Sequence, residues 1–164
     1  MKLLITGGAG CLGSNLIERY LPQGHEILVI DNFATGKREV VPPVRGLTVI
    51  EGTIADEPTV RRAFESFAPT RVIHSAAAYK DPANWREDVA TNVTGTINVI
   101  EAAKRAGVKR FVNFQTALCY GLHPIEQPIT IEHPIRPTSS YAISKTAGEQ
   151  YLAELPPDPR SVLA

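Results

Sequence analysis

A glycine-rich stretch close to the start of the chain constrains the fold more than any other part of the sequence. Residues 7–13 read GGAGCLG; Leu3 to Thr6 before them is typical of a short buried strand, and Ser14 to Leu21 after them of a helix. Glycines in a strand–loop–helix unit let the backbone turn sharply and approach a pyrophosphate, and the helix N-terminus offers it free N–H groups. The pattern predicts a dinucleotide-binding loop, with a plain tight turn as the alternative.

An acidic residue closes the next apolar run. His25 to Ile30 is predicted as the second strand, and Asp31 follows it. At this distance from a glycine loop, a carboxylate can accept hydrogen bonds from both hydroxyls of an adenosine ribose, and it repels a 2′-phosphate. The position of Asp31 therefore favours NAD over NADP, although the nearby Lys37 and Arg38 would favour NADP. The alternative is that Asp31 only ends the strand in a turn.

Strand and helix signals alternate along the rest of the chain. The remaining predicted elements are strands at 47–51, 70–74 and 110–114, and helices at 56–67, 85–106 and 140–155. Strands that are apolar on both faces and alternate with helices predict a parallel sheet covered on each side. Right-handed crossovers make this a doubly wound α/β fold. The 164 residues are enough for one domain, residues 1–164.

The balance of charges excludes several classes of partner. Seventeen Lys and Arg balance seventeen Asp and Glu without long runs of either sign, so neither nucleic acid nor an anionic membrane is expected. No apolar run approaches the roughly 18 residues of a membrane span. The four histidines lack metal-ligand spacing, so no metal site is expected. Two cysteines, Cys11 and Cys119, make no disulfide framework, which favours a cytoplasmic protein.

A tyrosine and a lysine lie four residues apart in the last predicted helix. This spacing puts the Tyr141 phenol and the Lys145 ammonium on one helix face. A cation within hydrogen-bonding range can lower a phenol pKa by about 1–3 units, so that the tyrosine exchanges a proton with a substrate hydroxyl near neutral pH. Such a pair arises by chance on many helices. In a chain that also carries a dinucleotide loop, it predicts an acid–base site.

These motifs together resemble those of the extended short-chain dehydrogenase/reductases, in the group of nucleotide-sugar epimerases and dehydratases. The similarity runs from Met1 to about Leu155. Besides the glycine loop and the Tyr–Lys pair it rests on Asp31-Asn32, His74-Ser75-Ala76-Ala77, Asn92-Val93-Thr94-Gly95-Thr96 and Phe114 to Gly121. The resemblance implies a Rossmann-like fold with a tightly held NAD. It also implies a nucleotide-sugar substrate, from which a hydride is removed and to which it is later returned.

The resemblance also implies roles for individual residues. Thr116 would donate a hydrogen bond to the substrate oxygen, Tyr141 would be the acid/base, and Lys145 would bind the nicotinamide ribose and tune Tyr141. Where relatives often have an acidic residue that contacts the adenine amine, this chain has Thr53. The implied cofactor-binding residues are Gly7, Gly10, Cys11, Leu12, Gly13, Asp31, Asn32, Thr53, Ile54, Ala76, Ala77, Asn92, Tyr141 and Lys145.

Two departures from the family pattern refine the expected function. The 4,6-dehydratases carry an Asp–Glu pair directly after the catalytic threonine, whereas this chain has Ala117 and Leu118, which cannot transfer protons. Epimerase or simple oxidoreductase chemistry is therefore favoured, and we expect an epimerase. The alternatives are a keto-sugar reductase or dehydratase of the same family, and a non-catalytic NAD-binding or dimerising module. Relatives are also longer, so we expect the last strands and the small C-terminal substrate region to be missing from this chain.

Several residues carry less specific expectations. Cys11 is expected to fill the space between loop and helix, with a thiol of lowered pKa at the helix N-terminus as the alternative. Trp85 is expected to pack at a helix start, with the border of the substrate cleft as the alternative. Tyr79 and Lys80 are expected in a solvated loop, with the border of the substrate cleft as the alternative. His74 is expected at a strand end, near the cofactor or not.

An oligomeric state follows from the resemblance as well. In the family, the long helix and the Tyr–Lys helix pair across a two-fold axis to form a four-helix bundle. The corresponding helices, at 85–106 and 140–155, are both predicted here, so a homodimer is expected.

Overall fold

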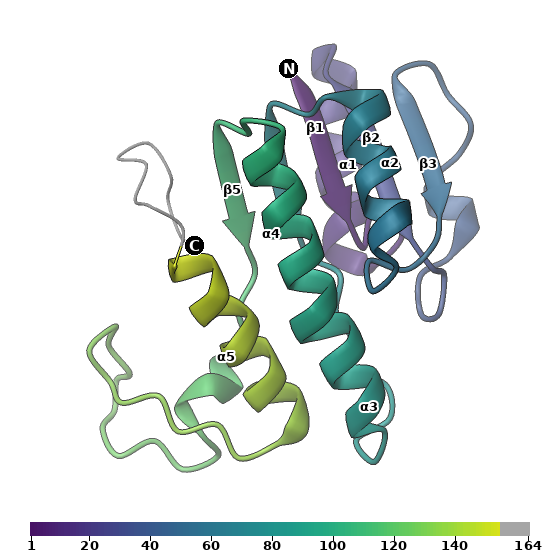
Figure 1. Ribbon diagram of the computed structural model, residues 1–164. Helices are drawn as coiled ribbons and strands as arrows, with labels where there is room; N and C mark the ends of the chain where they lie inside the picture. Colours follow the sequence, from purple (N-terminus) through teal and green to yellow (C-terminus); the bar gives the residue numbers. More distant parts are fainter. Residues whose placement is uncertain (155–164) are drawn as a thin grey trace.

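The computed structural model describes residues 1–154, which form a five-stranded parallel sheet (Figure 1). The strands are β1 (Lys2–Thr6), β2 (Glu26–Asp31), β3 (Leu47–Glu51), β4 (Arg71–His74) and β5 (Arg110–Asn113). Their order in the sheet is β3-β2-β1-β4-β5. The chain therefore adds β2 and β3 on one side of β1 and then β4 and β5 on the other side, so the strand order reverses at β1. In a doubly wound sheet, such a reversal leaves a crevice beyond the carboxyl ends of the strands, where ligands bind.

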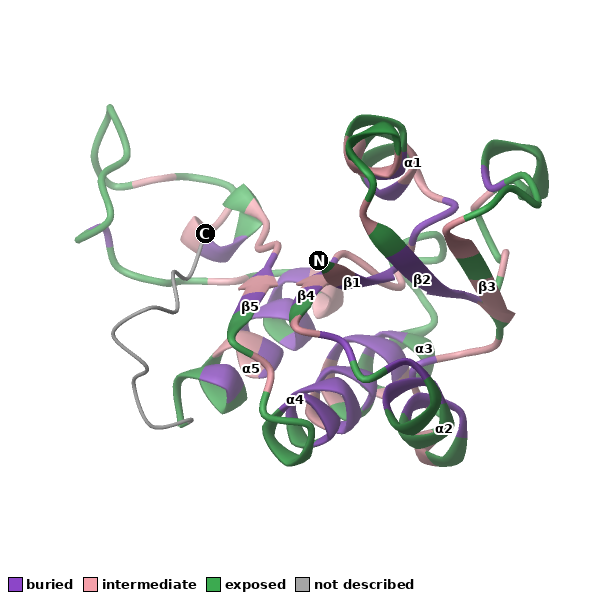
Figure 2. Ribbon diagram, turned by 90° about the horizontal axis from the view of Figure 1, so that it is seen from above, coloured by how far each residue is buried: buried purple, intermediate pink, exposed green. Residues whose placement is uncertain are grey.

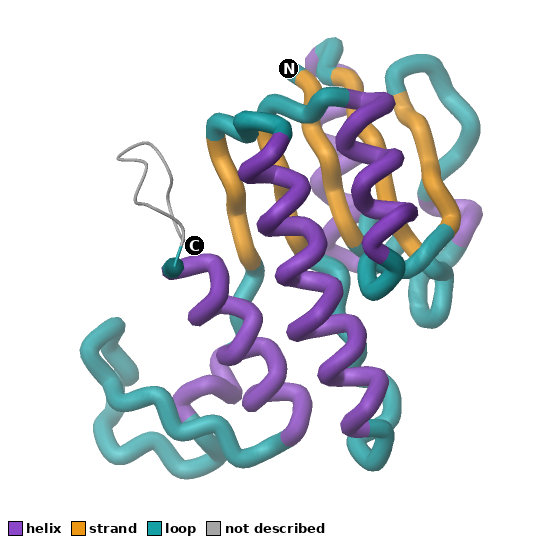
Figure 3. The backbone as a smooth tube through the Cα atoms, viewed as in Figure 1, coloured by secondary structure: helices purple, strands orange, loops and turns teal. Residues whose placement is uncertain are grey.

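The helices agree with the predicted alternation, with one unforeseen feature. They are α1 (Cys11–Tyr20), α2 (Glu57–Phe67), α3 (Trp85–Asp88), α4 (Thr96–Arg105) and α5 (Ser140–Ala153), with single 3-10 turns η1 (Leu21–Gln23), η2 (Arg38–Val40) and η4 (Ala117–Tyr120). The long helix predicted at 85–106 runs without a break from α3 to α4, as Figure 3 shows, but its middle is a π-helix, η3 (Val89–Gly95). Among residues 1–154, no helix is long and apolar enough to cross a membrane.

Two apolar layers hold the helices on the sheet, one on each face. Alternate residues of a strand point to opposite faces, so Leu3 and Ile5 of β1 pack in the layer under α1, whereas Leu4 packs toward α2 and α4. Figure 2 shows α1 on one side of the sheet and α2 with α4 on the other. Leu152 near the end of α5 joins the α2–α4 layer. The doubly wound, Rossmann-like fold is thereby confirmed.

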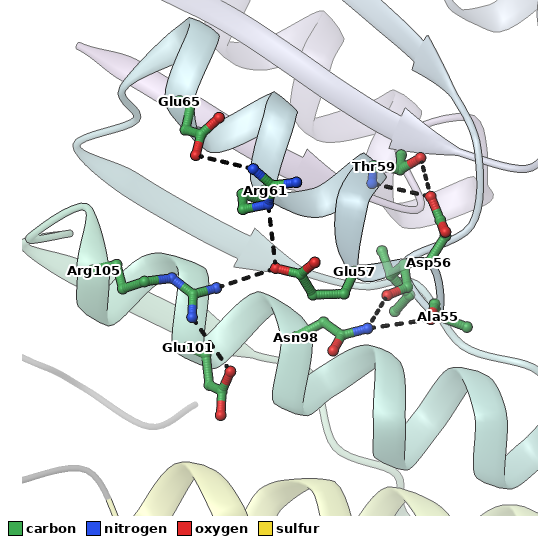
Figure 4. Close-up of polar contacts among 10 residues, drawn as sticks. Ala55, Asp56, Glu57, Thr59, Arg61, Glu65, Asn98, Glu101 and Arg105 are labelled. Carbon is green, nitrogen blue, oxygen red and sulfur yellow. Dashed lines mark hydrogen bonds and ion pairs between the residues drawn. The ribbon is translucent and has the colours of Figure 1, made fainter.

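Polar contacts fix the segment after β3 against α4 (Figure 4). The Asn98 side-chain amide donates to the carbonyl oxygens of Ile54 at 2.9 Å and Ala55 at 3.3 Å. Asp56 then caps α2, because its Oδ2 accepts from the backbone N–H of Thr59 at 3.0 Å. The exposed ion pairs drawn in the same figure, of which Arg105–Glu57 joins α4 to α2, contribute little to stability by comparison. The turn at Ile54 is therefore fixed to α4 by the side chain of Asn98.

Candidate active site

A cleft of about 430 Å³ lies beyond the carboxyl ends of the central strands. One end is formed by the glycine loop, and Tyr141 of α5 lies in the lining together with the segment after β4. The predicted cofactor-binding residues in the lining are Gly7, Gly10, Cys11, Leu12, Gly13, Asp31, Asn32, Thr53, Ile54, Ala76, Ala77 and Tyr141. Asn92, Thr116 and Lys145 are not part of this lining. The structure thus brings together most of the residues that the sequence singled out.

The glycine loop presents the start of α1 to the cleft. Gly10 is the N-cap of α1, and no side chain caps the helix there, so its first N–H groups are free for an anionic ligand. Gly7 has a φ of +71°, and a Cβ at this position would lie 2.7 Å from the backbone nitrogen of Ala76. The expectation that Cys11 fills an apolar space was wrong: its side chain is exposed and lines the cleft. Gly7 thus lets the loop pack directly against the backbone of the segment after β4.

The Asp31 carboxylate ties the glycine loop to the end of β2. Its Oδ2 accepts from the backbone N–H of Ala9 and its Oδ1 from that of Phe33, each at 2.8 Å. A carboxylate oxygen can accept a second hydrogen bond, so both oxygens keep capacity for a ligand in the cleft. The Arg38 guanidinium, which would favour NADP, is instead paired with Glu51 and lies 4.2 Å from the centre of the Phe33 ring.

His74 is buried next to the wall of the cleft and does not line it. Its Nδ1 lies 2.7 Å from Thr6 Oγ1, and its Nε2 lies 2.9 Å from Thr96 Oγ1. The Thr96 hydroxyl donates its proton to the carbonyl of Asn92, so it must accept a hydrogen bond from His74 Nε2. The ring proton of His74 is therefore on Nε2, and the Thr6 hydroxyl donates to Nδ1. Thr6 Oγ1 in turn accepts from the Ala76 N–H at 3.2 Å. Complete burial lowers the pKa of His74 to about 3, with a contribution from the charge of Lys145.

Asn92, in the π-helix, holds the segment after β4 from the other side. Its Oδ1 accepts from the Ala78 N–H at 2.8 Å, and its Nδ2 donates to the Ala78 carbonyl at 2.9 Å and to Ser144 Oγ at 3.0 Å. The side chain is almost fully buried, so it positions residues 76–78 of the cleft wall and connects them to α5. The close approach of α5 depends on Gly148, where a Cβ would lie 2.6 Å from the Asn92 carbonyl oxygen.

Tyr141 and Lys145 both lie in α5, but the pKa of Tyr141 moves in the opposite direction to the prediction. Burial is the main cause that raises it; the charges of Tyr79 and Asp88 add to the effect, and a hydrogen bond with Thr116 opposes it. Lys145 is not among the causes. Lys145 is itself nearly buried, and this burial lowers its pKa to about 8. The predicted lowering of the phenol pKa by Lys145 was therefore wrong, because burial raises the pKa of Tyr141 and Lys145 does not act on it.

The structure also places residues that the sequence reasoning missed or misjudged. Trp85 was expected to pack at the helix start but is 67% exposed. Tyr79 and Lys80 lie exposed in a loop, as expected, and they also line the cleft, in agreement with the alternative weighed for them. Further polar residues of the lining were missed: Asn84, Glu87, Asp88 and Thr91. Their spacing of three and four residues marks one polar helix face, and this signal could have found them.

A comparison with family models identifies the kind of protein that has this cleft. Residues 3–156 match the model of the NAD dependent epimerase/dehydratase family. The chain belongs to this family. The match extends over both the glycine loop and the Tyr–Lys helix, so the whole cleft described above falls within it.

Individual members of the family agree with this assignment. The chain is 36% identical over 132 residues to a UDP-glucose 4-epimerase of Klebsiella pneumoniae, covering 76% of this chain and 95% of that one. It is 65% identical to the Bordetella bronchiseptica enzyme WbmG in complex with NAD, with a TM-score of 0.94, covering 99% of this chain and 52% of that one. A UDP-glucose 4-epimerase of Thermus thermophilus in complex with NAD is 40% identical, with a TM-score of 0.82, covering 93% of this chain and 50% of that one. The chain thus spans about half the length of the solved structures it matches.

Proposed function

We propose that the chain binds NAD in this cleft and supplies the acid–base residues of a nucleotide-sugar epimerase. The observation that carries the proposal is the continuity of one cleft from the glycine loop to Tyr141. The uncapped start of α1 would hold the diphosphate, the free acceptor capacity of Asp31 would hold the adenosine ribose, and Thr53 with Ile54 would contact the adenine. When bound, NAD supplies the site that accepts and returns a hydride.

The chain's own residues would manage the proton of the sugar hydroxyl. Tyr141 takes this proton as the hydride leaves the sugar carbon and gives it back as the hydride returns. Thr116, whose side chain lowers the pKa of Tyr141, would donate to the same sugar oxygen. The raised pKa keeps the phenol protonated in the free chain, and a positive charge beside the phenol would lower the pKa again by stabilising the phenolate. Lys145 would bind the nicotinamide ribose.

Epimerase chemistry is proposed over dehydration because of the residues after Thr116. Ala117 and Leu118 begin the 3-10 turn η4, and neither side chain can transfer a proton. A keto-sugar reductase stays the second candidate, since it would use the same Tyr–Lys pair. NAD that copurifies with the chain, with no net reduction of a keto-sugar, supports the epimerase; consumption of NADH with net reduction supports the reductase.

The substrate class and the cellular location are part of the same proposal. The names of the relatives refer to UDP-glucose, and a second WbmG structure, 69% identical with a TM-score of 0.91, is a complex with NAD and UDP. We therefore propose a nucleotide sugar as substrate, with UDP as the first nucleotide to test. Cys11 and Cys119 are both unpaired, which supports a reducing, cytoplasmic location.

The cofactor preference gives a direct test. We expect NAD+ to bind at least about tenfold more tightly than NADP+, because the Asp31 carboxylate would repel a 2′-phosphate. Titration calorimetry with both nucleotides measures the ratio. Asp31→Asn should reduce the ratio of the NAD+ affinity to the NADP+ affinity. Glu65→Gln, which removes an exposed charge from α2, should leave this ratio unchanged. Equal affinities for the two nucleotides in the unaltered chain would contradict the assignment of Asp31.

We also propose that the chain forms a homodimer through the continuous helix 85–105 and α5. Both carry exposed apolar side chains: Trp85 and Val89 are 67% and 52% exposed, and Ile143 and Tyr151 are 52% and 51% exposed. Light scattering should therefore report a dimer for the unaltered chain. Ile143→Asp should shift it to a monomer, because burying the carboxylate costs several kcal/mol. Val44→Asp, at a similarly exposed position outside these helices, is the matched control, and a monomeric unaltered chain would refute the proposal.

A further inference from the structure

Asp88, the last residue of α3, carries a buried carboxylate to which the acid–base chemistry above gives no role. The residue is only 2% exposed, yet it lines the cleft alongside Tyr141. It also lines a second hollow of about 440 Å³, which shares Tyr79 and Tyr141 with the cleft. Within residues 1–154, its Oδ2 has no hydrogen-bond partner. Asp88 therefore lies where the two hollows meet, and one of its buried carboxylate oxygens accepts no hydrogen bond from residues 1–154.

A buried, unpaired carboxylate oxygen is costly, because the charge has lost its water and gained nothing in return. None of the ion pairs found among the described residues includes Asp88. A ligand in the cleft that carries positive charge would compensate this cost. The chemistry of the site thus favours a cationic group beside Tyr141.

The charges along the cleft point to the same kind of ligand. At the glycine-loop end, the start of α1 offers free N–H groups and the positive end of a helix dipole. In the segment from Lys80 to Asp88, the lining has three carboxylates, those of Asp81, Glu87 and Asp88, and one ammonium. A ligand with anionic phosphates at one end and a cation at the other matches this polarity. The charge of Asp88 already acts on the Tyr141 phenol, so the two groups are close enough for a cation beside the phenol to be attracted as well.

On the basis of the proposed function, we propose that Asp88 discriminates between the two redox states of the cofactor. Its carboxylate stabilises the cationic, oxidised nicotinamide ring and gives no such stabilisation to the neutral, reduced ring. Transfer of a hydride, one proton with two electrons, from the sugar carbon to the ring removes the positive charge. Asp88 therefore favours the return of that hydride to the sugar, which is the second half of an epimerisation.

The test measures the dissociation constants of NAD+ and NADH for the whole chain by titration calorimetry at low ionic strength. Asp88→Asn keeps the size of the side chain and removes the charge. We expect this variant to weaken NAD+ binding about five- to tenfold and to leave NADH binding within about twofold. Asp88→Glu, which keeps the charge, should restore most of the preference. Glu101→Gln, on the exposed side of α4, should change neither constant.

The outcomes separate this inference from the proposed function. If the unaltered chain binds neither nucleotide, the proposed function fails. If it binds both and Asp88→Asn shifts the two constants equally or leaves both unchanged, the role of Asp88 is overturned while the cofactor site stands. Asp88→Ser serves in place of Asp88→Asn if that variant does not fold. If neither folds, the unaltered chain decides: tighter binding of NAD+ than of NADH supports the inference, and the reverse overturns it.

Discussion

Gly13→Ala is expected to abolish NAD+ binding, lowering the affinity by about 100-fold or more, and to destabilise the fold by about 1–3 kcal/mol. A Cβ at this position would lie 2.4 Å from the Gly7 carbonyl oxygen and 2.5 Å from Gly8 Cα. Both are backbone atoms, so no side-chain rotation relieves the contact. The loop and the start of α1 would be pushed apart, which displaces the first N–H groups of α1, to which we assign the diphosphate. Titration calorimetry and urea unfolding measure the two effects.

Two other glycines separate the loss of binding from the loss of stability. At Gly10, φ is −80° and a Cβ would meet only the Gly7 carbonyl oxygen, at 3.3 Å. Gly10→Ala should therefore fold normally but lose NAD+ binding, because its methyl group enters the cleft. Gly107→Ala, with a φ of +64° and no atom within 4 Å, should lose about 1 kcal/mol of stability without any change in binding. Wild-type affinity in Gly13→Ala would show that the cleft is not the NAD site.

Most of the fold could be predicted because it follows from local patterns. Every strand was expected to within about one residue at each end, since apolar runs bounded by polar residues mark buried parallel strands. Asp56 was expected to open α2, and it caps that helix as expected. The π-helix at Val89–Gly95 was not expected, because the four-residue steps from Val89 to Val93 and Ile97 fit an α-helix as well as a π-helix.

The candidate site, like the fold, could be predicted from the sequence only in part. The glycine loop, Asp31 and Tyr141 were found because each is part of a motif whose members are close in sequence. The role of Asn92 depends on contacts with Ala78 and Ser144, which come from distant elements, so no spacing reveals it. The pKa of Tyr141 was expected to fall because the reasoning considered charge alone. Burial, which only the packed structure determines, reverses the direction.

The free energy of unfolding is expected to fall as the pH drops from 7 toward 4, with His74 as a main cause. The folded chain keeps this histidine neutral, with a pKa of about 3 against an ordinary value of 6.5. Between these values the unfolded chain binds a proton that the folded chain does not, so stability rises with pH in this window. The contribution of His74 is complete above about pH 6.5 and is lost below it, by about 3 kcal/mol at pH 4. Urea unfolding across this pH range measures the slope.

His74→Gln isolates this contribution. Glutamine is neutral throughout the range, so the slope between pH 7 and 4 should become much shallower, while stability at pH 7 falls by about 1–3 kcal/mol because Thr6 loses its acceptor. His123→Gln, at an exposed histidine in the loop after η4, should keep the slope of the unaltered chain. The link from His74 through Thr6 to Ala76 predicts that NAD+ binding weakens in the same variant, since Ala76 lines the cleft. If the unfolding free energy of His74→Gln kept the same dependence on pH, the buried His74 ring would bind a proton as readily as a histidine exposed to water.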